Sequence, residues 1–310
     1  MERGLTRQLL RRVCAAEVDT QDASYNRHQA EEQYLLEVEA LPTFVTQPGT
    51  IDAQRHERMY DLLLPLIEAH PDARWLTIGD GRFGGDAMAL KKRGARAVAS
   101  SIADVTLAEA KNRGLIDEFA VVNAENIPFE NDAFDFVLCK ESYHHFPRPP
   151  VAFYEMLRVA SRAVILIEPQ ETRPRLMDGF KSWFKRTFRA GQITDLFEPS
   201  GNYIYRASFR EVEKMLLAMN QRSLAVRRFN DFAHAALADE PYDSLSPKVA
   251  LFRIGIFAQD VLGGLGLMQD GLASIVAFKG EPDLQTRRCL RKAGYMITDL
   301  PVNPFLDTEN

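Results

Sequence analysis

The segment Trp75-Leu-Thr-Ile-Gly-Asp-Gly-Arg-Phe-Gly-Gly-Asp86 decides the fold of this chain. It begins as a short apolar strand, passes through a glycine-rich turn and leads into a helix that we expect to continue to about Leu90. Glycines at positions 79 and 81 permit a tight turn and allow a ligand to approach the backbone where a Cβ would block it. The amides of the following helix lie at the same place. An ordinary tight turn would give the same pattern.

Strands and helices alternate on both sides of this turn. Apolar residues at helical spacing predict an amphipathic helix over 51–70, and apolar segments predict five strands, at 75–79, 95–100, 119–122, 134–140 and 163–169. Apolar strands in strict alternation with helices are typical of a parallel sheet covered on both faces. We therefore predict a Rossmann-like, doubly wound α/β fold with a mostly parallel sheet. Its ligand should lie beyond the carboxyl ends of the strands.

The alternation divides the chain into three parts. Residues 1–50 read as a helical N-terminal extension, residues 51–280 as the main domain with insertions at 170–207 and 233–270, and residues 281–310 as a C-terminal segment packed on the core. Two further strands are expected, at 224–232 and 271–280, with helices near 208–219 and 248–262 and a final amphipathic segment at 284–295. The first of these helices opens with a capping-box signature, Ser208-Phe-Arg-Glu211.

The composition excludes several classes of protein. The 310 residues carry a net charge of −5 with 46% hydrophobic residues, which is ordinary for a globular protein and argues against a nucleic-acid partner. Three widely separated cysteines indicate a reducing compartment and neither a metal site nor a disulfide framework. No apolar run is long enough for a signal peptide or a membrane span. We expect a cytoplasmic protein, and a homo-oligomer remains open.

A second polar segment, Asn123-Ala-Glu-Asn-Ile-Pro-Phe129, follows the third predicted strand, and Phe134-Asp-Phe-Val137 opens the fourth. Together with the glycine turn, these segments resemble the class I methyltransferases that depend on S-adenosylmethionine (SAM). More narrowly, they resemble the branch that methylates small molecules, including glycan and natural-product precursors. The resemblance is strong over residues 73–169 and weaker over 208–280. It implies SAM as the cofactor on a Rossmann-like core.

The resemblance also implies which residues hold SAM. Gly79, Asp80 and Gly81 would lie against the methionine part, and Asn123, Ala124 and Glu125 would frame the adenine. Asn123 stands where the family usually has Asp, and its side-chain oxygen can still accept a hydrogen bond from the adenine amino group.

Two positions depart from the family pattern. Thr77 replaces an acidic residue before the first glycine, and Ser101 replaces the acidic residue that would accept hydrogen bonds from the ribose hydroxyls. Asp80 and Asp104 are nearby acids, neither in the usual register. We assign Ser101 to the cofactor site, with its ribose contacts in doubt.

A third site, Cys139-Lys-Glu-Ser-Tyr-His-His-Phe-Pro147, ends the fourth predicted strand, where a methyl acceptor would lie. Removal of a hydroxyl proton suits a histidine that titrates near neutral pH. His145 is the first candidate for the catalytic base and His144 the second, although both could simply cap the strand end. Lys140 is assigned to the cofactor. Glu168, which ends the fifth predicted strand, would orient the acceptor or only terminate the strand.

The insertion at 170–207 is rich in aromatic and basic residues. Its segment 180–189 could form a lid over the acceptor or a solvated helix packed on the core, and Tyr203 and Tyr205 could stack on a sugar or ring.

Three functions compete on this sequence. The first is a SAM-dependent methyltransferase that acts on a hydroxyl or amine of a small molecule. The second is a nicotinamide-dependent oxidoreductase, because Gly79, Gly81 and Gly84 fit the dinucleotide spacing. That interpretation expects an acid near Ser101 and leaves the segment 123–129 unexplained. The third is a non-catalytic SAM-binding protein.

Overall fold

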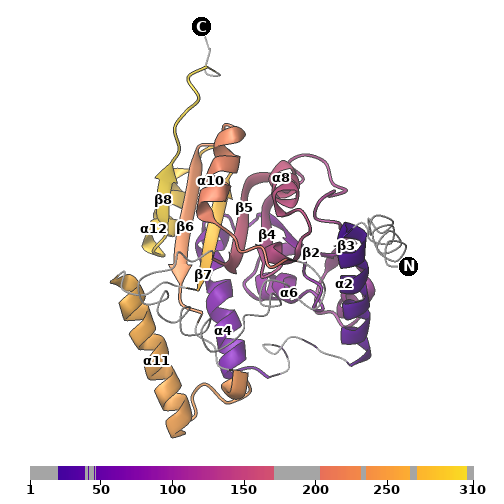
Figure 1. Ribbon diagram of the computed structural model, residues 1–310, viewed down its shortest axis with the longest axis vertical. Helices are drawn as coiled ribbons and strands as arrows, with labels where there is room; N and C mark the ends of the chain where they lie inside the picture. The colour runs from indigo at the N-terminus through magenta and orange to yellow at the C-terminus, as the bar shows by residue number, and fades with distance from the viewer. Residues whose placement is uncertain are drawn as a thin grey trace, which may run out of the picture.

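The structure, a computed structural model, describes residues 20–38, 41, 45, 47–170, 203–231, 235–265 and 271–305. Its centre is an eight-stranded sheet in the order β3-β2-β1-β4-β5-β7-β6-β8 (Figure 1). The strands are β1 (Arg74–Ile78), β2 (Arg96–Ser101), β3 (Glu118–Val121), β4 (Phe134–Lys140), β5 (Ala160–Pro169), β6 (Ser223–Phe229), β7 (Leu272–Phe278) and β8 (Met296–Asp299).

Helices cover the sheet and flank it. They are α2 (Thr20–Glu37), α4 (Ile51–Tyr60), α5 (Leu64–Ala69), α6 (Gly85–Lys92), α7 (Val105–Asn112), α8 (Pro149–Val159), α10 (Phe209–Ala218), α11 (Pro247–Gly264) and α12 (Leu284–Lys292). Short 3-10 turns are η1 (Asp61–Leu63), η2 (Tyr143–His145) and η4 (Ala235–Leu237).

The first five strands are parallel neighbours, which confirms the predicted α/β fold. β7 runs antiparallel to β5 and β6, and β8 runs antiparallel to β6. β6 therefore runs in the same direction as β5, so its carboxyl end lies at the same edge of the sheet. The predicted strands lie within a few residues of the observed ones, and β4 occupies the predicted residues 134–140.

The edge strand β8 was not predicted. The last element expected from the sequence was an amphipathic helical segment, which α12 confirms, but residues 296–299 were not recognised as a strand. Three of its four residues are exposed, and it pairs with β6 on one side only. A strand of this kind has neither an apolar run nor a buried face, so hydrophobic periodicity carries no signal for it.

Alternate residues of the strands pack on opposite faces of the sheet. Leu76, Ile78 and Val137 join a core with α8 and α10 on one face, and Trp75 and Phe136 join a second core on the other. The second core holds residues of α5, α6 and α12. Because both faces are buried, the central strands read as nearly continuous apolar runs.

Two local predictions were wrong. The single helix expected over 51–70 is divided into α4, η1 and α5, because Pro65 stands in the first turn of α5 and has no N–H for an uninterrupted helical ladder. Helix α10 does begin after Ser208, but the Ser208 side chain makes no capping hydrogen bond. The Glu211 carboxylate instead accepts from the Tyr205 hydroxyl at 2.7 Å, so the expected capping box does not form.

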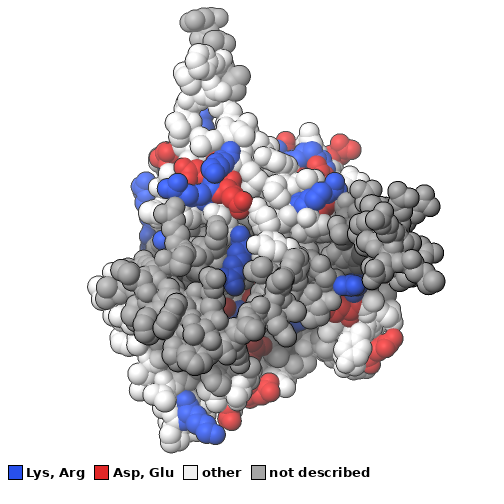
Figure 2. Space-filling view, in the orientation of Figure 1, with Lys and Arg blue, Asp and Glu red and all other residues white. Residues whose placement is uncertain are grey.

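The first and last described elements lie at different parts of the molecule (Figure 1). Helix α2 packs beside α7, next to the β2–β3 side of the sheet, whereas α12 packs against α5 and leads into β8. Figure 2 shows acidic and basic side chains mingled over the end that holds α10 and β8. Within the described ranges, no helix has the length and apolar character that crossing a membrane requires.

Tyr295 ties the C-terminal segment to the core, so Tyr295→Phe should destabilise the fold. Its buried hydroxyl lies 2.9 Å from the Leu62 carbonyl oxygen and 2.8 Å from Ser274 Oγ. Loss of the hydroxyl leaves buried polar groups without this partner, which costs about 1–3 kcal/mol. Urea unfolding would measure the loss. Tyr34→Phe, at an exposed tyrosine of α2, is the control, and an equal effect of both variants would contradict this account.

Candidate functional site

The glycine turn after β1 is braced from inside by Asp80. Its carboxylate accepts hydrogen bonds from the backbone amides of Asp86 and Ala87, both at 2.9 Å, and from the Thr77 hydroxyl at 2.8 Å. Burial and the neighbouring Asp86 carboxylate raise the pKa of Asp80 well above its usual range. The Asp80 side chain therefore organises the start of α6.

The same turn is packed against the end of β4. Gly79 has a φ of 76°, and a Cβ on it would lie 2.5 Å from the Cβ of Ser142. Ser142 Oγ donates to the Gly79 carbonyl oxygen at 2.9 Å. Only glycine fits this position, because the backbone is left-handed and the space for a side chain is already filled.

Glu168 at the end of β5 holds the turn that follows β4. One carboxylate oxygen accepts from the backbone amides of Ser142 and Tyr143 at 2.7 and 2.8 Å. The other lies 2.6 Å from Nδ1 of His144. Glu168 is fully buried and His144 is 9% exposed. Both oxygens of Glu168 are thus engaged by the protein, which favours a positioning role for this carboxylate over direct contact with an acceptor.

The two histidines predicted as candidate bases lie together but differ in their surroundings. Their ring centroids are 4.0 Å apart, and the His145 ring also lies 5.5 Å from the ring of His28 on α2. His144 Nδ1 is the nitrogen that contacts Glu168. A carboxylate on Nδ1 fixes the tautomer of an imidazole and directs proton transfer to Nε2.

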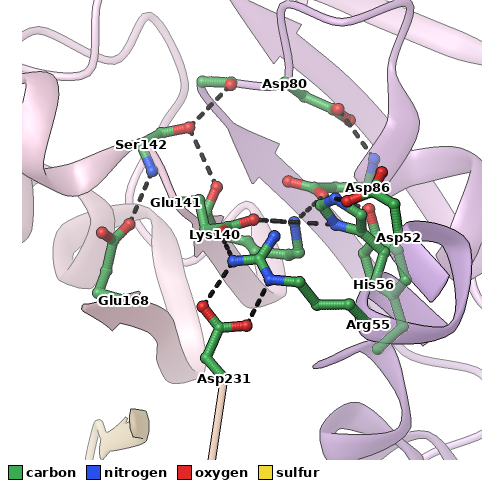
Figure 3. Close-up of polar contacts among 12 residues, drawn as sticks. Asp52, Arg55, His56, Asp80, Asp86, Lys140, Glu141, Ser142, Glu168 and Asp231 are labelled. Carbon is green, nitrogen blue, oxygen red and sulfur yellow. Dashed lines mark hydrogen bonds and ion pairs between the residues drawn. The ribbon is translucent and has the colours of Figure 1, made fainter. Parts of the chain in front are cut away.

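A partly buried cluster of charges lies beside this turn (Figure 3). Arg55 of α4 lies between Glu141 and Asp231, with Nη2 2.7 Å from an oxygen of each. Glu141 also accepts from Lys140 Nζ at 2.8 Å and has a φ of 50°. Burial alone would raise the pKa of Glu141, but Lys140 and Arg55 lower it below its ordinary value. A left-handed non-glycine residue that is held by two cations is a local strain of the kind found at functional sites.

Lys140, which we had assigned to the cofactor, belongs to this cluster. Its ammonium is almost fully buried, 3.8 Å from Asp86 and over the ring of Tyr60. Tyr60 in turn donates to Asp86 at 2.8 Å. The cluster therefore connects α4 with the start of α6 and the end of β4, and a contact between Lys140 and SAM stays a prediction.

A cavity of about 530 Å³ lies next to the same cluster. Its lining includes Asn230, which precedes Asp231, and Arg58, which lies one helical turn after Arg55. Asp260 and Gly263 of α11 also line it. The cavity thus reaches the carboxyl end of β6, at the edge of the sheet where ligands of this fold bind.

The segment expected to frame adenine is fixed by side chains of its own and of α2. Asn123 Oδ1 accepts from the Glu125 amide at 2.9 Å and from the Tyr25 hydroxyl at 3.0 Å. Glu125 accepts from the Arg148 amide and side chain, each at 2.7 Å. Ala124 is buried between them. The Asn123 oxygen that we assigned to adenine therefore already accepts two hydrogen bonds, one of them from the N-terminal extension.

At Ser101 the structure places a carboxylate that the sequence patterns did not reveal. Ser101 Oγ donates to Glu32 of α2, and Thr106 Oγ1 donates to the other oxygen of Glu32 at 3.2 Å. A Cβ on Gly81 would lie 2.5 Å from Glu32 Oε1. Asp104, the acid that follows Ser101 most closely in the sequence, lies instead at the N-terminus of α7. Glu32 is 69 positions from Ser101, so no local motif could reveal it.

The lid expected in the insertion at 170–207 falls on residues 171–202, which lie outside the described residues. The end of the insertion is described and reaches the site. The Tyr205 amide donates to the His144 carbonyl oxygen at 3.3 Å, and the Tyr205 ring lies 6.1 Å from that of Tyr143.

Comparison with known proteins identifies the class. Residues 76–167, from β1 to β5, match the family described as a methyltransferase domain. This part of the chain contains the glycine turn, the segment 123–129 and the end of β4. Residues 76–167 are therefore a methyltransferase domain, which supports an enzyme that uses SAM.

One solved structure supports the fold, and others are similar at lower TM-scores. The [4+2]-cyclase SpnF has a TM-score of 0.50 at 18% identity, with 82% of this chain and 96% of that chain covered. YcgJ from Bacillus subtilis has a TM-score of 0.49 at 19% identity, covering 73% and 99%. Magnesium protoporphyrin IX methyltransferase from Synechocystis PCC 6803, with bound S-adenosylhomocysteine (SAH), has a TM-score of 0.42 at 17% identity, covering 57% and 77%.

The burial of Glu32 predicts a pH-dependent stability. Burial raises the pKa of this carboxyl from 4.5 to about 7, although hydrogen bonds from Ser101 and Thr106 oppose the change. Folding therefore favours the protonated form, so the protein loses stability as the pH rises from below 4.5 through 7.

Glu32→Gln should remove this loss. The quantity to compare is the free energy of unfolding of Glu32→Gln minus that of the wild type. This difference should be larger at pH 8 than at pH 5, by up to about 3 kcal/mol. Urea unfolding at the two pH values measures the difference. Glu37→Gln, which removes the same charge from an exposed position of α2, is the control. If the difference in free energy of unfolding between Glu32→Gln and the wild type did not change with pH, burial would not destabilise the ionised Glu32 carboxylate.

Proposed function

We propose that the protein transfers the methyl group of SAM to a hydroxyl or amine of a small molecule, with His144 as the base. The observation that carries the proposal is the His144–Glu168 pair, 2.6 Å apart, at the end of β4. Ser142 joins this turn to the carbonyl oxygen of Gly79, so the base is fixed relative to the proposed cofactor turn. Of the two candidates from the sequence, we place His144 ahead of His145, because Glu168 orients His144.

The glycine turn lies at the carboxyl edge of the sheet, where ligands of this fold bind. A Cβ on Gly79 or Gly81 would meet Ser142 or Glu32 at 2.5 Å, so the turn packs against these side chains only because both positions are glycine. SAM supplies a methyl group on a positively charged sulfur. The acceptor would provide the electron pair for the new bond, SAH would be the leaving group, and His144 would accept the acceptor's proton at Nε2.

A cavity at the carboxyl end of β6 suits a small acceptor. The cavity of about 530 Å³ is within the range of small-molecule sites. It lies near the Arg55–Glu141–Asp231 cluster, in which Arg55 and Lys140 together balance the two carboxylates. A sugar or natural-product precursor with several hydroxyl groups suits such a lining.

The competing functions have less support. The dinucleotide interpretation required an acid of the core near position 101, where the chain has Ser101, and the family matched by residues 76–167 is a methyltransferase domain. A protein that only binds SAM would not need an oriented histidine. The carboxylate on Nδ1 of His144 therefore favours catalysis.

His144→Ala should lower the turnover number by about 10²–10⁴-fold, the usual contribution of a general base, and leave SAH affinity unchanged. His144→Gln is a second variant that can keep a hydrogen bond to Glu168. The assay incubates the enzyme with SAM and a panel of polyhydroxylated and amine-bearing small molecules, and follows the formation of SAH and of methylated product. His145→Ala is the matched control.

A loss confined to His145→Ala would reassign the base to His145. Near-normal turnover of both variants would leave catalysis to proximity and orientation alone. If the wild type forms no SAH with any acceptor but binds SAH tightly, the enzyme assignment survives only for acceptors outside the panel, and failure to bind SAH would refute the function itself.

A further inference from the structure

We propose that Glu32 of the N-terminal helix α2 supplies the carboxylate that binds the ribose hydroxyls of SAM. The inference rests on the SAM-binding function and adds a residue from outside the α/β core to the cofactor site. At the end of β2, this chain has Ser101 in place of the acidic residue that the resemblance implies. The Ser101 hydroxyl donates a hydrogen bond to the Glu32 carboxylate.

The position of the carboxylate is the first support. One oxygen of Glu32 contacts Ser101 at the end of β2, and a Cβ on Gly81 would lie 2.5 Å from that same oxygen. Thr106 Oγ1, at the start of α7, lies 3.2 Å from the second oxygen and 2.8 Å from the Gly81 carbonyl oxygen. The carboxylate is thus held between the glycine turn and the end of β2, the two places between which this fold binds the sugar of its cofactor.

The face that α2 turns to the sheet is the second support. Helix α2 has no apolar stripe. Leu36, near its end, packs on an apolar cluster, but the residues before it that contact the core carry polar groups: Ser24, Tyr25, His28, Gln29 and Glu32. A helix that docks for stability alone buries a stripe of apolar side chains. A polar inner face over the carboxyl edge of a sheet indicates instead a helix that covers a polar ligand.

The chemistry of the buried carboxyl is the third support. Glu32 is 6% exposed, and among the described residues no Lys or Arg forms an ion pair with it. Two hydroxyl donors do not saturate a carboxylate, which has about four acceptor sites. A ribose diol offers two further hydroxyl donors, and the positive charge of SAM favours the ionised form. The ligand therefore supplies hydrogen-bond donors that the protein does not give to the Glu32 carboxylate.

The test measures SAH binding by calorimetry at pH 8, without an acceptor or turnover. Glu32→Gln keeps the size of the side chain but removes the charge and should weaken SAH binding about 10- to 100-fold, as expected for hydrogen bonds to a charged group. Glu32→Asp should fall between the wild type and Glu32→Gln. Glu37→Gln, on the same helix, should bind as the wild type does.

A modified ligand separates a ribose contact from a merely structural role. The 2′-deoxyribosyl analogue of SAH lacks one of the proposed donors. The wild type should bind it more weakly than SAH, and Glu32→Gln should bind the two ligands with nearly equal affinity. A structural residue would weaken both ligands by the same factor and preserve the wild-type preference.

A transplant of the carboxylate is the strongest arm of the test. In the double variant Glu32→Ala/Ser101→Asp, the acid moves from α2 to the end of β2, into space that Glu32 vacates. SAH affinity should recover, at least in part, relative to Glu32→Ala alone. The transplant keeps the proposal testable if α2 docks less firmly in the single variants, because the core then carries the acid by itself.

The outcomes separate this inference from the function on which it rests. If the wild type does not bind SAH, both fail. If the wild type binds SAH and the Glu32 variants bind equally well or more tightly, this inference alone is wrong. Tighter binding in particular would show that Glu32 obstructs the site. Weaker binding, loss of the ribose preference and rescue by Ser101→Asp together support it.

Discussion

The site depends on one interaction, the capture of two backbone amides by the buried carboxylate of Glu168. Where β4 ends, the amides of Ser142 and Tyr143 leave the sheet and need an acceptor in a place that water does not reach. The neighbouring strand β5 ends in that acceptor. Ser142 is thereby directed to Gly79, and His144 is directed to the second oxygen of Glu168. The positions of the glycine turn, the post-β4 turn and the histidine all follow from this contact.

The need to balance charges within the protein is a second constraint on the site, around Glu141 and around Glu32. Buried charges are costly unless they are paired, and the chain meets this cost in two different ways. Around Glu141 the charges are balanced within the protein, by Arg55 and Lys140. At Glu32 two neutral hydroxyl groups donate to the carboxylate, and burial raises the pKa of the carboxyl instead. The first arrangement is complete without a ligand, and the second is completed by one.

The sequence predicted what local patterns can encode. The alternation of apolar strands with helices correctly indicated the parallel part of the sheet, and the glycine turn and the 123–129 segment indicated the class of enzyme. The sequence did not single out Glu32 and Arg55, because their contacts with the site span 69 and 86 positions along the chain. The short, exposed edge strand β8 was not predicted, because it has no buried face that would give an apolar pattern. Asp80 was found, but its role in bracing α6 depends on backbone amides, which a residue pattern does not display.

The polar docking of α2 has a consequence for how the enzyme is controlled. A helix held largely by hydrogen bonds with Ser101 and Asn123 opens at a lower free energy than the sheet beneath it. If the ligand contacts α2, closure of the helix and occupation of the site are linked reciprocally, since each favours the other by the same coupling free energy. The outer side of α2 exposes Tyr34 and Val38. Any molecule that bound there and held the helix closed would raise the affinity for the cofactor without touching the catalytic core.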